Sequence, residues 1–218
     1  MTSPPFDPLR LAWPSADRPG LERRLARIGL VPDGDHTLRW TAGSVRLVES
    51  AAGGERLVLE PGPSTAPRMP ADGTSDAALE LLGVGWGTVE LDRAAAEFTM
   101  AAFEAAPDDP LLGAFARRSI GDARLVLLEP NTEGRLSATL AKWGEGPVAL
   151  YLAGRGPDRP FAGPASGGAA VVSTAREGPF GPSVILLGGP ITGPHVVVVV
   201  GRSGADGTDP APAGTIGA

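Results

Sequence analysis

The sequence predicts a mixed α+β protein in which one pattern, a strand, a helix and then three strands (βαβββ), is repeated. Two observations support this prediction. Strand-like alternation, an amphipathic helix and short β-favouring runs occur in that order near the N-terminus, and the same order returns after a Pro-rich segment. A last group of β-favouring runs repeats the pattern without its helix. The 218 residues are 42% hydrophobic and 20% charged, which is the balance of an ordinary folded protein.

The first unit spans residues 1–61. Apolar residues alternate over 9–13 with the period of a strand. Ser15 or Asp17 can cap a following helix, which is predicted over 21–30 because leucines recur there at helical spacing. Three further strands are predicted at 36–40, 44–50 and 55–61.

Residues 62–76 are rich in Pro, Gly, Ser and Thr, so we expect a linker there. Two further units are expected over 77–201, and the tail 202–218 is predicted to be disordered. Asp92 is a natural cap for an Ala-rich helix at 93–106. A further helix is predicted at 135–143, and strands at 81–91, 113–120, 123–130, 147–154, 168–173, 183–187 and 195–200.

Charge and composition exclude several functional classes. The net charge is -6 and Cys is absent, which argues against nucleic-acid binding and excludes thiolate chemistry and Cys-ligated metals. The longest apolar run, 196–200, is too short to cross a bilayer, and no secretory signal is visible at the start of the chain. We therefore expect a cytoplasmic protein, and the abundance of Ala, Gly, Pro and Arg is typical of a GC-rich, actinobacterial genome.

Residues 80–200 resemble the vicinal oxygen chelate superfamily, which contains glyoxalases, bleomycin resistance proteins and methylmalonyl-CoA epimerases. The clearest stretch is LLEPNTEGRLSATLAKWGEGPVALYLA. It has the order found in the epimerases, where a strand ending in a Leu-Glu-Pro-like motif precedes an acidic loop, a helix, a Gly-Glu-Gly-like turn and a strand that begins with two histidines. The resemblance implies a glyoxalase-like fold, in which βαβββ units form a cupped mixed sheet.

The resemblance also implies a metal held by one side chain from each of four strands. The corresponding positions in this chain are Gly83, Val126, Ala149 and Val198. None of these side chains has a donor atom, so we expect neither a metal nor another cofactor. A register shifted by one residue would bring at most Glu129 and His195 toward such a site, and a shift of one also turns a strand side chain to the opposite face.

Strand alternation predicts which side chains share the cup with these positions. Gly83, Gly85 and Gly87 leave the first strand without side-chain bulk on that face. The other residues expected to point inward are Arg124, Val126, Leu128, Ala149, Tyr151, Val196, Val198 and Val200. From these we take Arg124, Val126, Leu128, Tyr151 and Val198 as candidate ligand-binding residues, because an apolar cup with a few polar groups suits a small molecule.

Three functions are compatible with this interpretation. The first is a metal-free protein that sequesters or senses an apolar small molecule in the cup. The second is a metal-independent enzyme of the isomerase or lyase type that uses Tyr151 or Glu129 as acid or base. The third is a structural or interaction protein whose cup is closed.

The remaining expectations concern the histidines and the assembly. His36 and His195 are predicted to lie at the surface or at a strand edge. We expect a monomer or a homodimer without nucleic-acid or membrane partners. The N-terminal unit can pack across the other two units within the same chain or pair with its copy in a second chain, and we favour the first arrangement.

Overall fold

The computed structural model describes residues 9–40, 42–51, 54–60, 79–99, 101–121, 124–154, 173–186 and 193–200. The N-terminal elements are β1 (Leu9–Ser15), α1 (Arg18–Ala26), β2 (Thr37–Trp40), β3 (Gly43–Glu49) and β4 (Val58–Leu59). The central elements are β5 (Leu79–Gly87), α2 (Leu91–Glu97), β6 (Phe103–Asp109), β7 (Ala114–Ser119) and β8 (Leu125–Pro130). The last elements are α3 (Arg135–Trp143), β9 (Gly146–Gly154), β10 (Ser183–Leu186) and β11 (His195–Val199).

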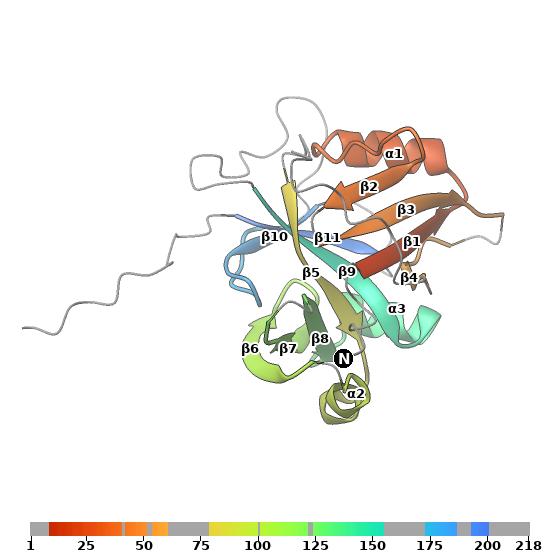
Figure 1. Cartoon of the computed structure of the whole chain (residues 1–218). Coiled ribbons are helices and arrows are strands. Elements are labelled where there is room, and N and C mark those ends of the chain that lie inside the picture. Colours follow the sequence, from red (N-terminus) through yellow and green to blue (C-terminus); the bar gives the residue numbers. More distant parts are fainter. Residues whose placement is uncertain are drawn as a thin grey trace, which may run out of the picture.

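The described strands form two sheets (Figure 1). The smaller sheet has the strand order β2-β3-β1-β4, and the larger one has the order β10-β11-β9-β5-β8-β7-β6. In Figure 1 the smaller sheet and α1 lie at one end of the molecule, while α2 and strands β6 to β8 lie at the other.

The N-terminal sheet follows the predicted order along the chain, but α1 spans Arg18–Ala26 and so begins and ends earlier than the predicted helix at 21–30. The Asp17 side chain caps α1 by accepting a hydrogen bond from the Gly20 amide at 2.9 Å. Strand β1 runs parallel to β3, and β3 pairs antiparallel with β2. Strand β4 pairs antiparallel with the other edge of β1, so the three later strands do not lie side by side.

The second unit is a complete βαβββ unit, but its helix is shorter than predicted. Helix α2 ends at Glu97, and the Ala-rich residues expected to continue it form strand β6 instead. Phe98 leaves the helical conformation, and the residues from Phe103 onward pair antiparallel with β7. Sheet pairing therefore overrides the helix propensity of the alanines, which is a weak preference.

The third unit contributes β9, β10 and β11. Strand β9 runs parallel to β11, and β11 pairs antiparallel with β10. The unit joins the second one through the antiparallel pair of β5 and β9. This strand order confirms the predicted fold class, an α+β protein whose repeated units form a glyoxalase-like mixed sheet. The strand predicted at 168–173 lies, apart from its last residue, outside the described residues.

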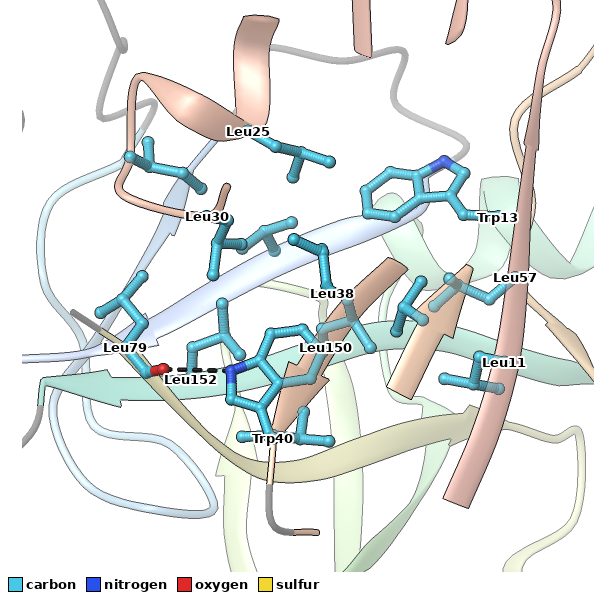
Figure 2. Close-up of a cluster of buried hydrophobic side chains, with 14 of the residues drawn as sticks. Leu11, Trp13, Leu25, Leu30, Leu38, Trp40, Leu57, Leu79, Leu150 and Leu152 are labelled. Carbon is cyan, nitrogen blue, oxygen red and sulfur yellow. Dashed lines mark hydrogen bonds between the residues drawn. The ribbon is translucent and has the colours of Figure 1, made fainter. Parts of the chain in front are cut away.

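The two sheets share one hydrophobic core (Figure 2). Strands β5, β9 and β11 contribute Leu79, Leu150 and Val196 to it, and the N-terminal unit contributes Trp13 and leucines of α1, β1 and β2. The Trp40 indole N–H also donates to the Leu79 carbonyl oxygen at 3.0 Å, drawn as a dashed line in Figure 2. The predicted packing of the N-terminal unit within the chain is confirmed.

Two expectations about organisation stay predictions. The linker at 62–76 and the tail at 202–218 lie outside the described residues, so the domain division is untested. Among the described residues, no helix is long and apolar enough to cross a membrane.

Candidate functional site

The face of the seven-stranded sheet that points away from the N-terminal unit corresponds to the cup of the sequence analysis, and we call it the cup face. Strands β5, β7, β8, β9 and β11, helix α3 and the turn between β6 and β7 contribute buried apolar side chains to it. These are Leu82, Leu112, Ala114, Ala116, Val126, Leu128, Leu136, Val148, Ala149, Tyr151, Ala153, Val197 and Val199.

The structure brings together three of the five candidate ligand-binding residues. Val126 and Leu128 of β8 and Tyr151 of β9 belong to this one cluster, and each is 0% exposed. They face one another, but they present no surface to solvent. The cup is therefore packed as a core at these positions.

Val198 lies on the opposite face of the sheet, which corrects the prediction. It packs in the core beneath the N-terminal unit, while Val197 and Val199 point to the cup face. Strand register explains the outcome, because Val197 pairs with Tyr151 and Val198 pairs with Leu152. Every residue of β11 is buried, so its run of valines lacks the alternation that fixes a register. The inward orientations predicted for Val196 and Val200 are wrong for the same reason, because both residues also pack in or against the core beneath the N-terminal unit.

Arg124 also departs from its predicted place. It precedes β8 with a φ of 47°, and its guanidinium donates to the Leu81 carbonyl oxygen at 2.7 Å instead of entering the cup. The same side chain lies 3.7 Å from the Glu80 carboxylate and is 36% exposed. Arg124 therefore ties β8 to β5 at the rim.

The glycines of β5 allow the closest packing on the cup face. A Cβ atom at Gly85 would lie 2.8 Å from Leu128 Cδ1 and 3.1 Å from both Ala149 Cβ and Tyr151 Cε2. A Cβ atom at Gly87 would lie 2.9 Å from Leu140 Cδ2. As predicted, the glycines of β5 leave space on this face, which neighbouring side chains fill, although Leu82 of the same strand also packs there.

A buried hydrogen bond lies within this packing. The Tyr151 hydroxyl donates to Asp109 Oδ2 at 2.6 Å, and Asp109 Oδ1 accepts from the amides of Leu111 and Leu112, both at 3.0 Å. Burial raises the pKa of Asp109 although these donors oppose the rise. Burial, and then the Asp109 charge and the hydrogen bond to it, raise the pKa of Tyr151 well above 10. The sequence analysis missed Asp109, because the helix predicted at 93–106 includes the first part of what is strand β6.

A hairpin closes the cup beside Tyr151. The Phe180 ring centroid lies 5.2 Å from that of Tyr151, and the Arg118 guanidinium lies 5.8 Å from the centre of the Phe180 ring. Phe180 packs against the cup-face cluster from the turn that precedes β10. The sequence offered no periodicity for this segment, so neither Phe180 nor Arg118 was predicted.

His195 is buried, which corrects its predicted surface position. It is 3% exposed, and its Nε2 lies 3.3 Å from the Thr139 hydroxyl. Thr139 donates its own proton to the Arg135 carbonyl oxygen, so Nε2–H of His195 donates to Thr139. Burial, and secondarily the Arg135 charge, lower the pKa of His195 to about 4. Because that pKa lies well below neutrality, His195 is a neutral core residue at pH 7.

The other two polar candidates have structural partners. Glu129 Oε2 accepts from the Leu91 amide at 2.7 Å and so stabilises the start of α2. His36 is 41% exposed, as its predicted surface position requires, and its Nδ1 lies 2.8 Å from Glu22 Oε1. Neither residue points into the cup cluster.

The metal that the resemblance implies does not fit these residues. Val126 and Ala149 lie on the cup face beside the glycines of β5, and none of them supplies a nitrogen or oxygen ligand from its side chain. The fourth position, Val198, is on the other face. Among the described residues, no group of three or more His, Asp or Glu side chains is placed to hold a metal ion.

A small cleft lies elsewhere, between the N-terminal unit and the glyoxalase-like sheet. Its volume is about 50 Å³, room for little more than ordered water. It is lined by Arg56, Leu57, Thr139, Trp143, Gly144, Glu145, Gly146, Pro147, Val148 and Pro194.

Among the solved structures similar to this chain are the following three, each less than 25% identical in sequence. A hypothetical protein from Bacillus halodurans matches 60% of this chain and 99% of its own, at 17% identity and a TM-score of 0.48. Methylmalonyl-CoA epimerase from Streptomyces coelicolor matches over 56% of this chain and 97% of its own, at 19% identity and a TM-score of 0.46. The epimerase from Mycobacterium tuberculosis matches over 55% and 85%, at 20% identity and a TM-score of 0.44. No protein-family model and no curated protein matches the sequence.

Proposed function

We propose that this chain is a metal-independent, non-catalytic protein with a structural or interaction role, in which the glyoxalase-like cup has become part of the core. The observation that carries this proposal is the complete burial of Tyr151. Tyr151 is the one tyrosine of the chain, it lies on the cup face with 0% exposure, and its hydroxyl donates a hydrogen bond to the buried Asp109.

The packing argues against the two other functions. An enzyme that used Tyr151 or Glu129 would need one of them to reach a substrate, yet Tyr151 is buried and Glu129 caps α2. A cup that held an apolar ligand would need space among Val126, Leu128 and Tyr151, and these side chains touch their neighbours instead. The closed cup therefore fits the third function best.

Thiol labelling tests the closed cup directly, because the chain contains no cysteine of its own. Ala149→Cys places a thiol at 0% exposure on the cup face, and Ala105→Cys places one at an exposed position on β6 of the same sheet. Under native conditions we expect the Ala149→Cys thiol to react at least about a thousandfold more slowly than the control, since labelling then requires the protein to open.

The two variants first need similar unfolding midpoints in urea, so that protection reflects the native fold. Comparable labelling rates in two equally stable variants would show an open cup, and the proposal would then be wrong. A companion thermal-shift screen of apolar metabolites is expected to give no stabilising compound that competes with the Ala149→Cys label.

A further inference from the structure

The segment that closes the cup is a short hairpin that inserts one aromatic ring. Arg176 and Ser183 exchange two backbone hydrogen bonds, at 2.9 and 2.7 Å. Gly178 and Gly181 exchange two more, at 3.1 and 2.9 Å, with Pro179 and Phe180 at the turn between them. We call residues 176–183 the closing hairpin. Its tip belongs to no named strand and is joined by the two hydrogen bonds between Gly178 and Gly181.

The surroundings of Phe180 form a position suited to a flat ring. Gly83 lies on one side, where a Cβ atom would come within 3.0 Å of Phe180 Cζ, so the absence of a side chain there makes room for the ring. Tyr151 lies on another side with its ring tilted by 55° to that of Phe180. The Arg118 guanidinium lies over the ring in the arrangement of a cation–π contact.

Arg118 also recognises an oxygen atom next to the ring. Its Nη1 donates to the Pro179 carbonyl oxygen at 3.3 Å, and its Nη2 donates to Glu104 Oε1 at 2.8 Å. One guanidinium therefore contacts both the ring of Phe180 and the acceptor oxygen of the residue before it. A ligand that displaced the hairpin tip would need to supply both features.

We propose that the position of Phe180 is a subsite for a small aromatic carboxylate, which the closing hairpin occupies in the absence of ligand. The aromatic ring of the ligand takes the place of the Phe180 ring between Gly83 and Tyr151. Its carboxylate takes the place of the Pro179 carbonyl oxygen on Arg118, where a charge-assisted bond is stronger than the neutral one it replaces. This inference rests on the closed cup of the proposed function and adds a route by which the cup opens.

The test uses benzoate as the probe and cyclohexanecarboxylate as the matched acid without an aromatic ring. Phe180→Ala vacates the subsite, Phe180→Leu removes only the ring, and Phe115→Ala removes the ring of an exposed phenylalanine on β7 as the control. At ten times its Kd, benzoate is expected to raise the Tm of the Phe180→Ala protein by roughly 3–6 °C. The wild type and Phe115→Ala should shift far less, since Phe180 competes for the site in both.

Three further outcomes decide the inference. Phe180→Leu should also be stabilised more by benzoate than by cyclohexanecarboxylate, with a smaller rise in Tm. This variant keeps the test decisive if Phe180→Ala does not fold. Arg118→Gln in the Phe180→Ala background should lose at least about tenfold in benzoate affinity, as expected for removal of a charged hydrogen-bond donor. Equal shifts with both acids, or none with either Phe180 variant, would overturn the aromatic subsite.

Labelling of the Ala149→Cys thiol separates this inference from the proposed function. The thiol should become more reactive in the Ala149→Cys/Phe180→Ala double variant, and benzoate added to that double variant should restore its protection. If the thiol is protected in the Ala149→Cys single variant while neither Phe180 variant binds benzoate, the closed cup stands and the subsite does not. If the thiol is reactive in that single variant, the proposed function itself has failed.

Discussion

Acidification should destabilise this protein mainly through one histidine. The pKa of His195 falls from its ordinary 6.5 to about 4 because burial disfavours the charged ring, with a smaller contribution from Arg135. A base whose pKa is lower in the folded state contributes stability that is complete above pH 6.5 and is lost as the pH falls through 4. At about 1.4 kcal/mol per pH unit, the loss is about 3 kcal/mol.

Urea unfolding followed by tryptophan fluorescence measures this loss at pH 7 and pH 4. His195→Gln stays neutral over that range, and its amide can still donate to Thr139, so its free energy of unfolding should fall by about 3 kcal/mol less than that of the wild type. His36→Gln, at the other histidine of the chain, is the matched control and should keep the steep loss. If the wild type and His195→Gln lose the same free energy between the two pH values, the buried and neutral state assigned to His195 is wrong.

Three other predictions test the packing and the expected absence of a metal. Gly85→Ala should lower the free energy of unfolding by about 1–3 kcal/mol, because its Cβ atom would lie 2.8 Å from Leu128. At Gly34 an added Cβ atom meets nothing within 4 Å, so Gly34→Ala should change that free energy by less than about 0.5 kcal/mol. Equal effects of the two substitutions in urea unfolding would show that the cup face has room. A chain that starts at Asp76 should aggregate or unfold, because it lacks the N-terminal unit that covers Leu150 and its neighbours. Light scattering and urea unfolding measure this, and a soluble monomer as stable as the full chain would contradict the shared core. Elemental analysis of the untagged protein should find no stoichiometric transition metal, and about one zinc, nickel or iron per chain would refute the assignment of the ligand positions.

The sequence predicted the repeated units because their signals are local. The cap at Asp17, the helix at 135–143 and the alternation in β1 each depend on neighbouring residues alone, and the structure confirms all three. The resemblance also predicted which face Val126 and Ala149 share. Such patterns can be recognised from the sequence because the periodicity of side chains is a property of each helix or strand by itself.

The features that were missed depend on partners far away in the chain. The alanines of β6 favour a helix locally, and only the pairing with β7 makes them a strand. The five buried residues of β11 give no alternation, so their register is set by β9 and could not be read from the run itself. Asp109 and Tyr151 lie 42 residues apart in the sequence, and no spacing in the sequence predicts the hydrogen bond between them.

The ionisation of Tyr151 tests the closed cup most directly, because the chain has a single tyrosine and its absorbance can be followed alone. A solvent-exposed tyrosine is about nine-tenths ionised one pH unit above its ordinary pKa of about 10. Since burial and Asp109 raise the pKa of Tyr151 well above that value, the native protein should show almost no tyrosinate absorbance near 295 nm at pH 11, and the signal should appear only together with unfolding. A reversible titration with a midpoint near pH 10, in protein that is still folded by circular dichroism, would show that Tyr151 is accessible and would contradict the account of the cup as a closed core.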